Sequence, residues 1–219
     1  MKSNQNKVIH KITGVGIFSA LAFVTTLICK IIPSVGGFLS LDAKDAVIAI
    51  ASFIYGPLVA PIISAIVALI EFITVSDTGW YGLIMNFASS AVFSLAASLV
   101  YKFKKSFNGA AIGFGAAIVA TTGVMLLLNI FITPLYFGMP TEAVIELLPT
   151  LLLPFNFAKT LLNSAIALML YKPVVGAMRA ARLVPRSEHK TTFNKSSVLT
   201  LIVGGVSLLV AAVILIIIW

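Results

Sequence analysis

Residues Leu147 to Leu170 read LLPTLLLPFNFAKTLLNSAIALML, a stretch of almost continuous hydrocarbon that is long enough to span a lipid bilayer. Polar side chains interrupt this stretch at Asn156, Lys159 and Asn163. An ammonium group at the centre of a spanning helix costs roughly 2.5 to 3.5 kcal/mol on insertion scales, so such a residue usually faces a cavity, an opposite charge or a ligand. The stretch therefore predicts a membrane helix that carries a functional site.

The composition of the whole chain places this helix in an integral membrane protein. Of the 219 residues, 60% are hydrophobic and 10% are charged, and the mean hydropathy is +1.10. Soluble domains carry about 25% charged residues. The net charge of +8 comes from lysines and arginines beside apolar segments, as in the cytoplasmic loops of membrane proteins. This distribution argues against nucleic-acid binding.

The apolar segments predict an all-α bundle of six membrane helices, separated by turn residues such as Gly56-Pro57. The second is too short to cross a bilayer core of about 30 Å, so the loop before it should dip into the protein. The expected helices cover residues 8–32, 46–55, 58–75, 80–101, 109–133 and 147–171.

A seventh apolar segment follows a basic linker and contains no charged residue from 198 to 219. It is long enough for an additional transmembrane helix, which either packs on the bundle or contacts a partner. We therefore divide the chain into a six-helix membrane domain (1–181), a basic cytoplasmic linker (182–196) and an additional transmembrane helix (197–219).

The basic clusters set the expected orientation. They lie in the N-terminal tail, in the turn after the fourth helix and after the sixth helix. These positions share one side if every helix crosses, and the positive-inside rule assigns that side to the cytoplasm. We expect a multi-pass protein of the cell membrane with a cytoplasmic N-terminus.

Most polar side chains within the predicted spans share one depth. Glu71, Asn86 and Asn129 lie near the outer ends of the third, fourth and fifth helices. Asn156 and Lys159 lie in the outer half of the sixth helix, and their spacing of three places them on one face. Four helices thus direct amides, a carboxylate and an amine toward one pocket open to the outside.

A purely structural role for the same side chains stays open. Lys159 paired with Glu71 or Asp45 would be a structural ion pair. Each asparagine hydrogen-bonded between helices would contribute on the order of 0.6 kcal/mol. Lys30 lies near a helix end, where its side chain is expected to extend toward the interface.

Aromatic residues near this depth would provide flat walls for a planar ligand, because aromatic rings favour offset stacking. They are Trp80, Tyr81, Tyr136, Phe155 and Phe157.

The first helix carries small residues at Gly16 and Ala20, four apart, which let another helix approach closely. The stripe serves either packing within the bundle or docking of a separate membrane subunit.

The sequence lacks a motif for ATP hydrolysis, a cysteine cluster for a metal and a histidine in the interior of any predicted span. No G-x-x-x-x-G-K-S/T motif occurs, so the chain has no P-loop. The single cysteine, Cys29, excludes an intramolecular disulfide and a cysteine-based metal cage. We predict that the chain is not an enzyme and has neither a metal nor a cofactor of its own.

Five pieces of sequence between residues 14 and 182 resemble the substrate-binding S components of energy-coupling factor (ECF) vitamin transporters, most of all their riboflavin-binding branch. The pieces are Leu41-Asp42-Ala43-Lys44-Asp45, Ile54-Tyr55-Gly56-Pro57-Leu58, Asn86-Phe87, Leu128-Asn129 with Pro134-Leu135-Tyr136, and Leu153-Pro154-Phe155-Asn156-Phe157-Ala158-Lys159.

The resemblance implies a ligand and a set of contacts. In the riboflavin branch, the residues that match Asn129, Asn156 and Lys159 contact the flavin. We add Asn86, Glu71 and Asp45 to the candidate substrate-binding residues. With these three residues, the predicted substrate-binding site has six members.

The resemblance also implies a mechanism. An S component captures the vitamin outside, docks on a transmembrane T component through the stripe of Gly16 and Ala20, and topples in the membrane to release the vitamin inside. Two cytoplasmic ATPase subunits supply the energy, so this chain would need no ATP site.

The sequence departs from the riboflavin branch in the third helix, where Ser64, Val67 and Ala68 replace a glutamate and a lysine-asparagine pair. An S component for a different vitamin or metabolite is therefore the nearest alternative. A stand-alone ion-coupled solute carrier and a structural membrane protein without a ligand are the others.

Overall fold

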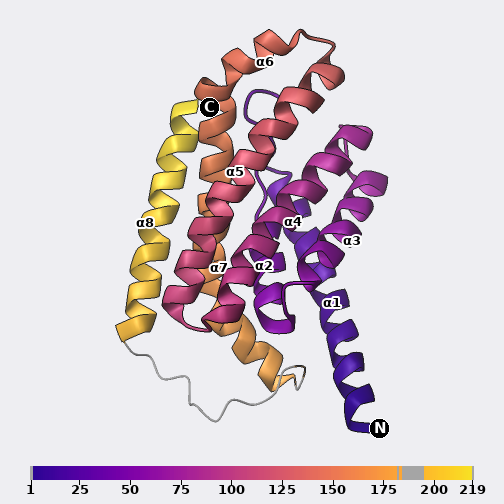
Figure 1. The fold of residues 1–219 in the computed structure, drawn as a ribbon, viewed down its shortest axis with the longest axis vertical. Helices are drawn as coiled ribbons and strands as arrows, with labels where there is room; N and C mark the ends of the chain where they lie inside the picture. Colours follow the sequence, from indigo (N-terminus) through magenta and orange to yellow (C-terminus); the bar gives the residue numbers. More distant parts are fainter. Residues whose placement is uncertain (1, 182, 184–194, 219) are drawn as a thin grey trace.

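The computed structural model describes the backbone at residues 2–181, 183 and 195–218, and the side chains at residues 8–181, 183 and 198–218. Over these residues the fold is a bundle of helices joined by loops (Figure 1), as the sequence predicted. The elements are α1 (Lys2–Cys29), α2 (Lys44–Tyr55), α3 (Val59–Thr74), α4 (Gly79–Phe103), α5 (Phe107–Phe137), α6 (Thr141–Leu147), the π-helical turn η1 (Leu148–Leu152), α7 (Leu153–Ala180) and α8 (Lys195–Ile218).

Within the described residues, five helical segments are long and apolar enough to cross a membrane. These are Val8–Cys29, Gly79–Phe103, Phe107–Phe137, Thr141–Ala180 and Val198–Ile218. Helix α2 has only 12 residues and α3 has 16. The expected short second helix is therefore present, and the loop that leads into it, around Asp42, is buried within the protein.

Helix α2 lies at the centre of the bundle, where it packs against α1, α3, α4 and α7. Its residues Ala46, Ala49 and Ala51 are fully buried, and such small side chains let neighbouring helices approach closely. Larger side chains such as Ile48 and Phe93 fill the remaining space of this core. The result is a rigid support under the α1–α2 loop.

Helix α5 extends beyond the expected end at residue 133 and runs through Pro134 to Phe137. It stops at Gly138, which adopts the left-handed conformation at φ +65°. The backbone N–H groups of Gly138 and Met139 both donate to the carbonyl oxygen of Pro134, a helix end that favours glycine. The helix therefore stops at the glycine and tolerates the proline.

The sixth predicted helix, 147–171, was wrong at both ends. The structure instead has the short helix α6, the π-turn η1, and α7, which continues to Ala180. The N–H of Leu153 donates to the carbonyl of Leu148, five residues back. Because Pro154 has no N–H and its ring collides with the carbonyl four residues earlier, the chain widens into a π-turn just before it.

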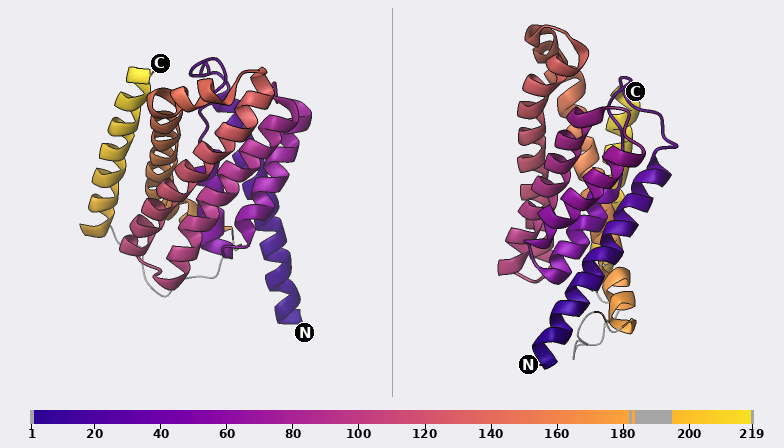
Figure 2. Two further views of the ribbon diagram at one scale, coloured as in Figure 1. Left: turned by 45° about the horizontal axis from the view of Figure 1, so that its top comes forward. Right: turned by 90° about the vertical axis from the view of Figure 1, so that its right-hand side faces the viewer.

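The basic segments gather at one end of the bundle, as expected if the helices cross. The N-terminus of α1, the turn between α4 and α5, and the C-terminal end of α7 lie together, whereas α6 lies at the opposite end (Figures 1 and 2). We call these the basic end and the α6 end.

Helix α8 packs along α7 at the edge of the bundle (Figures 1 and 2). A side chain at Gly204 would place its Cβ 2.7 Å from Cγ of Met169, so the two helices approach closely here. Of the two alternatives for the seventh segment, the structure shows packing on the bundle. Most of the predicted basic linker and Trp219 lie outside the described residues.

Candidate functional site

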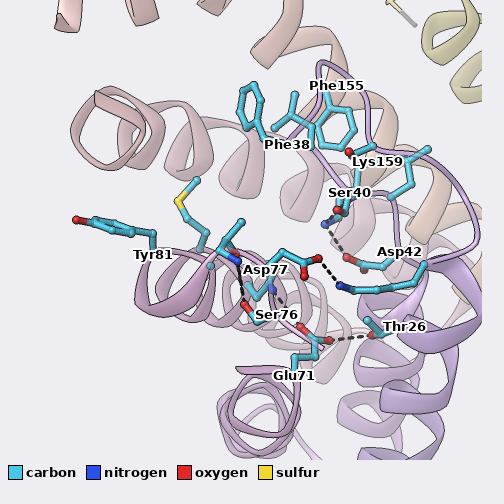
Figure 3. Close-up of a pocket in the computed structure, with 18 of the residues that line it drawn as sticks. Thr26, Phe38, Ser40, Asp42, Glu71, Ser76, Asp77, Tyr81, Phe155 and Lys159 are labelled. Atoms are coloured by element: carbon cyan, nitrogen blue, oxygen red, sulfur yellow. Dashed lines mark hydrogen bonds and ion pairs between the residues drawn. The ribbon is translucent and has the colours of Figure 1, made fainter. Parts of the chain in front are cut away.

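A cavity of about 330 Å³ opens near the α6 end, and residues from α1, α3, α4, α5, α7 and the α1–α2 loop line it. Figure 3 shows it from close by. The structure brings five of the six predicted substrate-binding residues to this cavity. They are Glu71, Asn86, Asn129, Asn156 and Lys159.

Four charged side chains form a buried chain of alternating sign along one wall. Lys159 Nζ lies 2.8 Å from Asp42 Oδ2, which in turn lies 3.8 Å from Lys44 Nζ. Lys44 Nζ donates to both oxygens of Glu71, at 2.7 and 2.8 Å. All four residues are at most 8% exposed. Each charge therefore has an opposite charge beside it, as burial of ions requires.

The predicted alternatives for an ion pair of Lys159 were wrong, because its partner is Asp42. Lys44, the first residue of α2 and two residues after Asp42, pairs with Glu71. Glu71 also accepts hydrogen bonds from Thr26 Oγ1 at 2.8 Å and from Asn86 Nδ2 at 3.0 Å. With these partners, Glu71 organises the α1–α3–α4 side of the cavity.

Asp45 does not line the cavity, contrary to the prediction. It is buried and accepts hydrogen bonds from Ser90 and Ser89 of α4. Ser94, one helical turn further along α4, donates to the backbone carbonyl of Asp45 at 3.4 Å. Asp45 sits in the first turn of α2 with its side chain directed toward α4, so it joins these two helices.

Asn163 shares a helix face with Asn156 and Lys159, yet it binds backbone rather than the cavity. Its Oδ1 accepts from the N–H of Ala46 at 2.9 Å, and its Nδ2 donates to the carbonyl of Asp42 at 2.9 Å. Asn163 thereby fixes both sides of the junction between the loop and α2. This positions the Asp42 carboxylate beside Lys159.

The two carboxylate oxygens of Asp42 differ in their hydrogen bonds. Its Oδ1 is buried without a hydrogen-bond partner among the described residues, whereas Oδ2 accepts a hydrogen bond from the ammonium of Lys159. Burial alone would raise the pKa of this carboxyl, but the adjacent Lys159 and Lys44 ammonium groups outweigh it and lower the pKa. Asp42 lies in the loop outside the five candidate spans. The carboxylate is therefore ionised and is held between the Lys159 and Lys44 ammonium groups on the cavity wall.

The two amides that resemblance assigns to a flavin are partly held by their own helices. Asn129 Nδ2 donates to the carbonyl of Met125 at 2.7 Å, and its Oδ1 accepts from Thr133 at 2.8 Å. Asn156 Nδ2 donates to the carbonyl of Leu152 at 2.8 Å, next to the π-turn. These bonds fix the orientation of both amides before any ligand arrives.

Aromatic rings form the remaining walls, although only some of the predicted ones. Phe38, Tyr81, Tyr136, Phe137 and Phe155 line the cavity. The prediction was wrong for Trp80 and Phe157, which lie outside the lining. Trp80 packs against Phe72 and is 68% exposed.

Lys30 lies just beyond the end of α1 and also lines the cavity. Its ammonium lies 3.0 Å from Asp77 and donates to the backbone carbonyl of Val75. Since Asp77 is largely exposed, this contact is worth little for stability. It joins the end of α1 to the loop after α3 at the rim.

The fold and this cavity define a substrate-binding membrane subunit. The chain belongs to the family of ECF transporter substrate-specific components, whose sequence model matches residues 10–175.

Two relatives and one solved structure agree with this assignment. The chain is 28% identical over 186 residues to the riboflavin transporter RibU of Staphylococcus aureus (strain TCH60), covering 82% of this chain and 96% of RibU. It is 26% identical over 187 residues to the riboflavin transporter FmnP of Bacillus subtilis (strain 168), covering 80% and 98%. The solved structure, described as the S component of a bacterial ECF transporter, superposes with a TM-score of 0.67 at 29% identity and covers 80% of this chain and 99% of its own.

Sequence reasoning missed Asp42 and Lys44 as members of the site, although both stand in the quoted loop motif. Their signal was their charge in a loop that leads into a helix too short to span the membrane. Such a loop must enter the protein, and its charges must then find partners there.

Proposed function

We propose that this chain captures riboflavin as the substrate-binding subunit of an ECF transporter. The observation that carries the proposal is the buried ion pair of Lys159 and Asp42 on the cavity wall, which places an ammonium donor beside a carboxylate. The names of the two relatives support riboflavin as the ligand. A cavity of about 330 Å³ falls within the usual range for small-molecule sites, about 300 to 1,000 Å³.

The chemistry of a flavin fits these groups. The pyrimidine edge of the isoalloxazine ring alternates carbonyl acceptors with one N–H donor. Lys159 and Asp42 offer the complementary donor and acceptor side by side, while Phe155 and Tyr81 provide apolar faces for the ring. In this arrangement Asn129 and Asn156 contact the ribityl chain and the ring edge. Glu71 holds Lys44 in place, Asn86 donates to Glu71, and Asp45 acts through α2 without contacting the ligand.

Transport requires partners in this proposal. Gly16 and Ala20 are exposed on α1, and a side chain at Gly16 would meet no atom within 4 Å. This bare face would dock on a T component, and two ATPase subunits would hydrolyse ATP on the cytoplasmic side. The chain itself would sit in the cell membrane with its basic end inside, carrying riboflavin as cargo and performing no catalysis.

A binding titration tests the proposal. Purified full-length protein should quench riboflavin fluorescence with a saturable, one-to-one isotherm, and protein from a riboflavin-containing medium should be yellow. Asp42→Asn should weaken the isotherm at least about tenfold, as expected when a charge-assisted hydrogen bond is lost, while Asp77→Asn at the rim serves as the matched control. A colourless protein that leaves riboflavin fluorescence unchanged would overturn the assignment.

A different vitamin or metabolite is the second candidate, favoured by the buried Lys44–Glu71 pair on the cavity wall. The same titration with a panel of other water-soluble vitamins separates the two candidates. Saturable binding of another member with no riboflavin binding would select the second. Uptake into liposomes driven by an ion gradient, without ATPase subunits, would instead support a stand-alone carrier.

A further inference from the structure

A second cavity lies at the basic end, away from the candidate substrate site, and neither the family assignment nor the proposed function uses it. Its volume is about 210 Å³, the space of roughly seven water molecules at about 30 Å³ each. Helices α2, α4, α5, α7 and α8 contribute to its lining. The lining residues include Phe53, Tyr101, Lys105, Tyr171, Lys172 and Thr200.

The inner wall of this cavity is aromatic and aliphatic. Phe53 stacks on Tyr101 with ring centroids 4.2 Å apart, and Phe53 also packs against Phe114 and Tyr171. The hydroxyl groups of Tyr101 and Tyr171 lie 3.0 Å apart and hydrogen-bond to one another. One hydroxyl donates to the other, and the surrounding aromatic rings make this wall mostly apolar.

Cationic and hydroxyl groups occupy the other side. Lys105 and Lys172 line the cavity and are both exposed. Ser106 also lines the cavity, and its hydroxyl caps α5 by accepting from the N–H of Gly109 at 3.2 Å. The first turn of α5 adds its positive dipole end at the same place. An apolar interior under a cationic mouth matches an amphiphile with an anionic head.

The position of the cavity identifies the amphiphile. Lys105 follows the span Gly79–Phe103, and Ser106 precedes the span Phe107–Phe137, so the mouth lies where spanning helices leave the hydrocarbon. Basic pockets between membrane helices at this depth recognise phospholipid head groups. We propose that the cavity binds one anionic phospholipid of the leaflet at the basic end, with its phosphate between Lys105 and Lys172 and its glycerol and upper acyl carbons against Tyr101 and Tyr171.

Helix α8, which lies beyond the residues that the family model matches, contributes one wall of this site. Thr200 lines the cavity from α8, whereas the family model ends at residue 175. Thr200 is 6% exposed and lies on the stripe through which α8 packs on α7. In this proposal α8 closes one wall of the lipid site, which gives the additional helix a ligand-binding role.

Native mass spectrometry of the full-length protein tests the site. The protein is titrated in detergent with phosphatidylglycerol and with phosphatidylcholine that carry the same acyl chains. One phosphatidylglycerol should remain bound at concentrations where phosphatidylcholine does not. Equal retention of the two lipids would overturn the proposal.

Two double variants show which lysine charges contribute to phosphatidylglycerol binding. Lys105→Gln with Lys172→Gln should weaken phosphatidylglycerol binding by about fivefold for each lysine. Lys102→Gln with Lys104→Gln changes the net charge equally at the same helix end, but neither residue lines the cavity, and it should leave binding unchanged. Equal losses in both variants would show attraction to a general basic surface and would contradict a built site.

Two further measurements distinguish binding of a lipid from binding of a free anion. Millimolar inorganic phosphate should not displace the bound phosphatidylglycerol, because it lacks the acyl chains; complete displacement would mean an anion site only. Thr200→Phe should fill the cavity and abolish lipid retention, whereas Leu199→Phe, at an exposed neighbour on α8, should not. Full lipid binding by a Thr200→Phe protein that remains monodisperse would also overturn the proposal.

Discussion

Helices α7 and α8 are both long apolar segments that lie side by side, yet they relate to the bundle in opposite ways. Helix α7 buries polar side chains, including Asn156, Lys159 and Asn163, against the α1–α2 loop and α2. Helix α8 buries one narrow stripe that includes Gly204, Ala211 and Leu215, and it exposes large apolar side chains elsewhere.

The difference shows how a membrane helix acquires a function. Hydrocarbon on a helix gains nothing by leaving lipid for protein, so an apolar helix associates through close packing. A helix with polar groups must satisfy them inside the protein, and those groups then fix the surrounding backbone. Helix α7 is therefore placed by its hydrogen bonds and ion pair, and α8 by the shape of its small residues.

The largest effect is expected when the buried charge of Lys159 is removed from α7. Lys159→Met leaves Asp42 buried with only the more distant Lys44 as a cation, which should destabilise the protein by roughly 3–5 kcal/mol. Riboflavin affinity should fall about ten- to a hundredfold, because a charge-assisted hydrogen bond is lost. Thermal unfolding in detergent and fluorescence quenching measure the two effects.

The double variant Lys159→Met with Asp42→Asn separates stability from binding. It removes both charges, so thermal stability should recover while riboflavin binding stays weak. Wild-type affinity in the single variant would show that Lys159 serves the ion pair alone.

Asn163→Ala should have the next largest effect. It deletes the bonds to the N–H of Ala46 and the carbonyl of Asp42, and each buried group left unpaired costs about 1–3 kcal/mol. The loop should also become more mobile, which hydrogen exchange of the backbone around Ala46 would report. Leu170→Ala, at a half-exposed position on the same helix, provides the control, and similar exchange in both variants would contradict the anchoring role.

Gly204→Val tests the contact between the two helices directly. The added Cβ would lie within 2.7 Å of Met169, and overpacking of this kind costs roughly 1–3 kcal/mol. Riboflavin affinity should stay unchanged, because α8 does not line the substrate cavity.

Gly205→Val is the matched control for this contact. A Cβ at this position would meet no atom within 4 Å, so the melting temperature of the Gly205→Val protein should lie close to that of the wild type. A loss at Gly205 as large as that at Gly204 would show that helix propensity, rather than packing, explains both.

The smallest effect is expected on the outer face of α8. Ile216 is 77% exposed, and Ile216→Ala should change stability by less than about 0.5 kcal/mol. A larger loss of thermal stability in detergent would show that this face is covered by protein in the purified sample.

The membrane class, the short central helix and the convergence of polar groups near one end could be predicted from sequence. Each follows from a local rule: the length of an apolar run, or the cost of a polar group within it. The residue-by-residue resemblance added the family. Helix boundaries near Pro134 and Pro154 were not predictable, since one proline was tolerated within a helix and the other gave a π-turn.

That Lys159 needs a partner follows from the amino-acid sequence, because an unpaired ammonium in hydrocarbon is too costly to keep. The packing of the helices determines which groups meet. Lys159 pairs with Asp42, and Lys44 pairs with Glu71. Asp45 and Asn163 hold α2 and do not face the cavity. The physical reason is that pairing between charges depends on distances of a few ångströms across different helices. Those distances are set by how small residues let the helices pack, which no local pattern of the chain specifies.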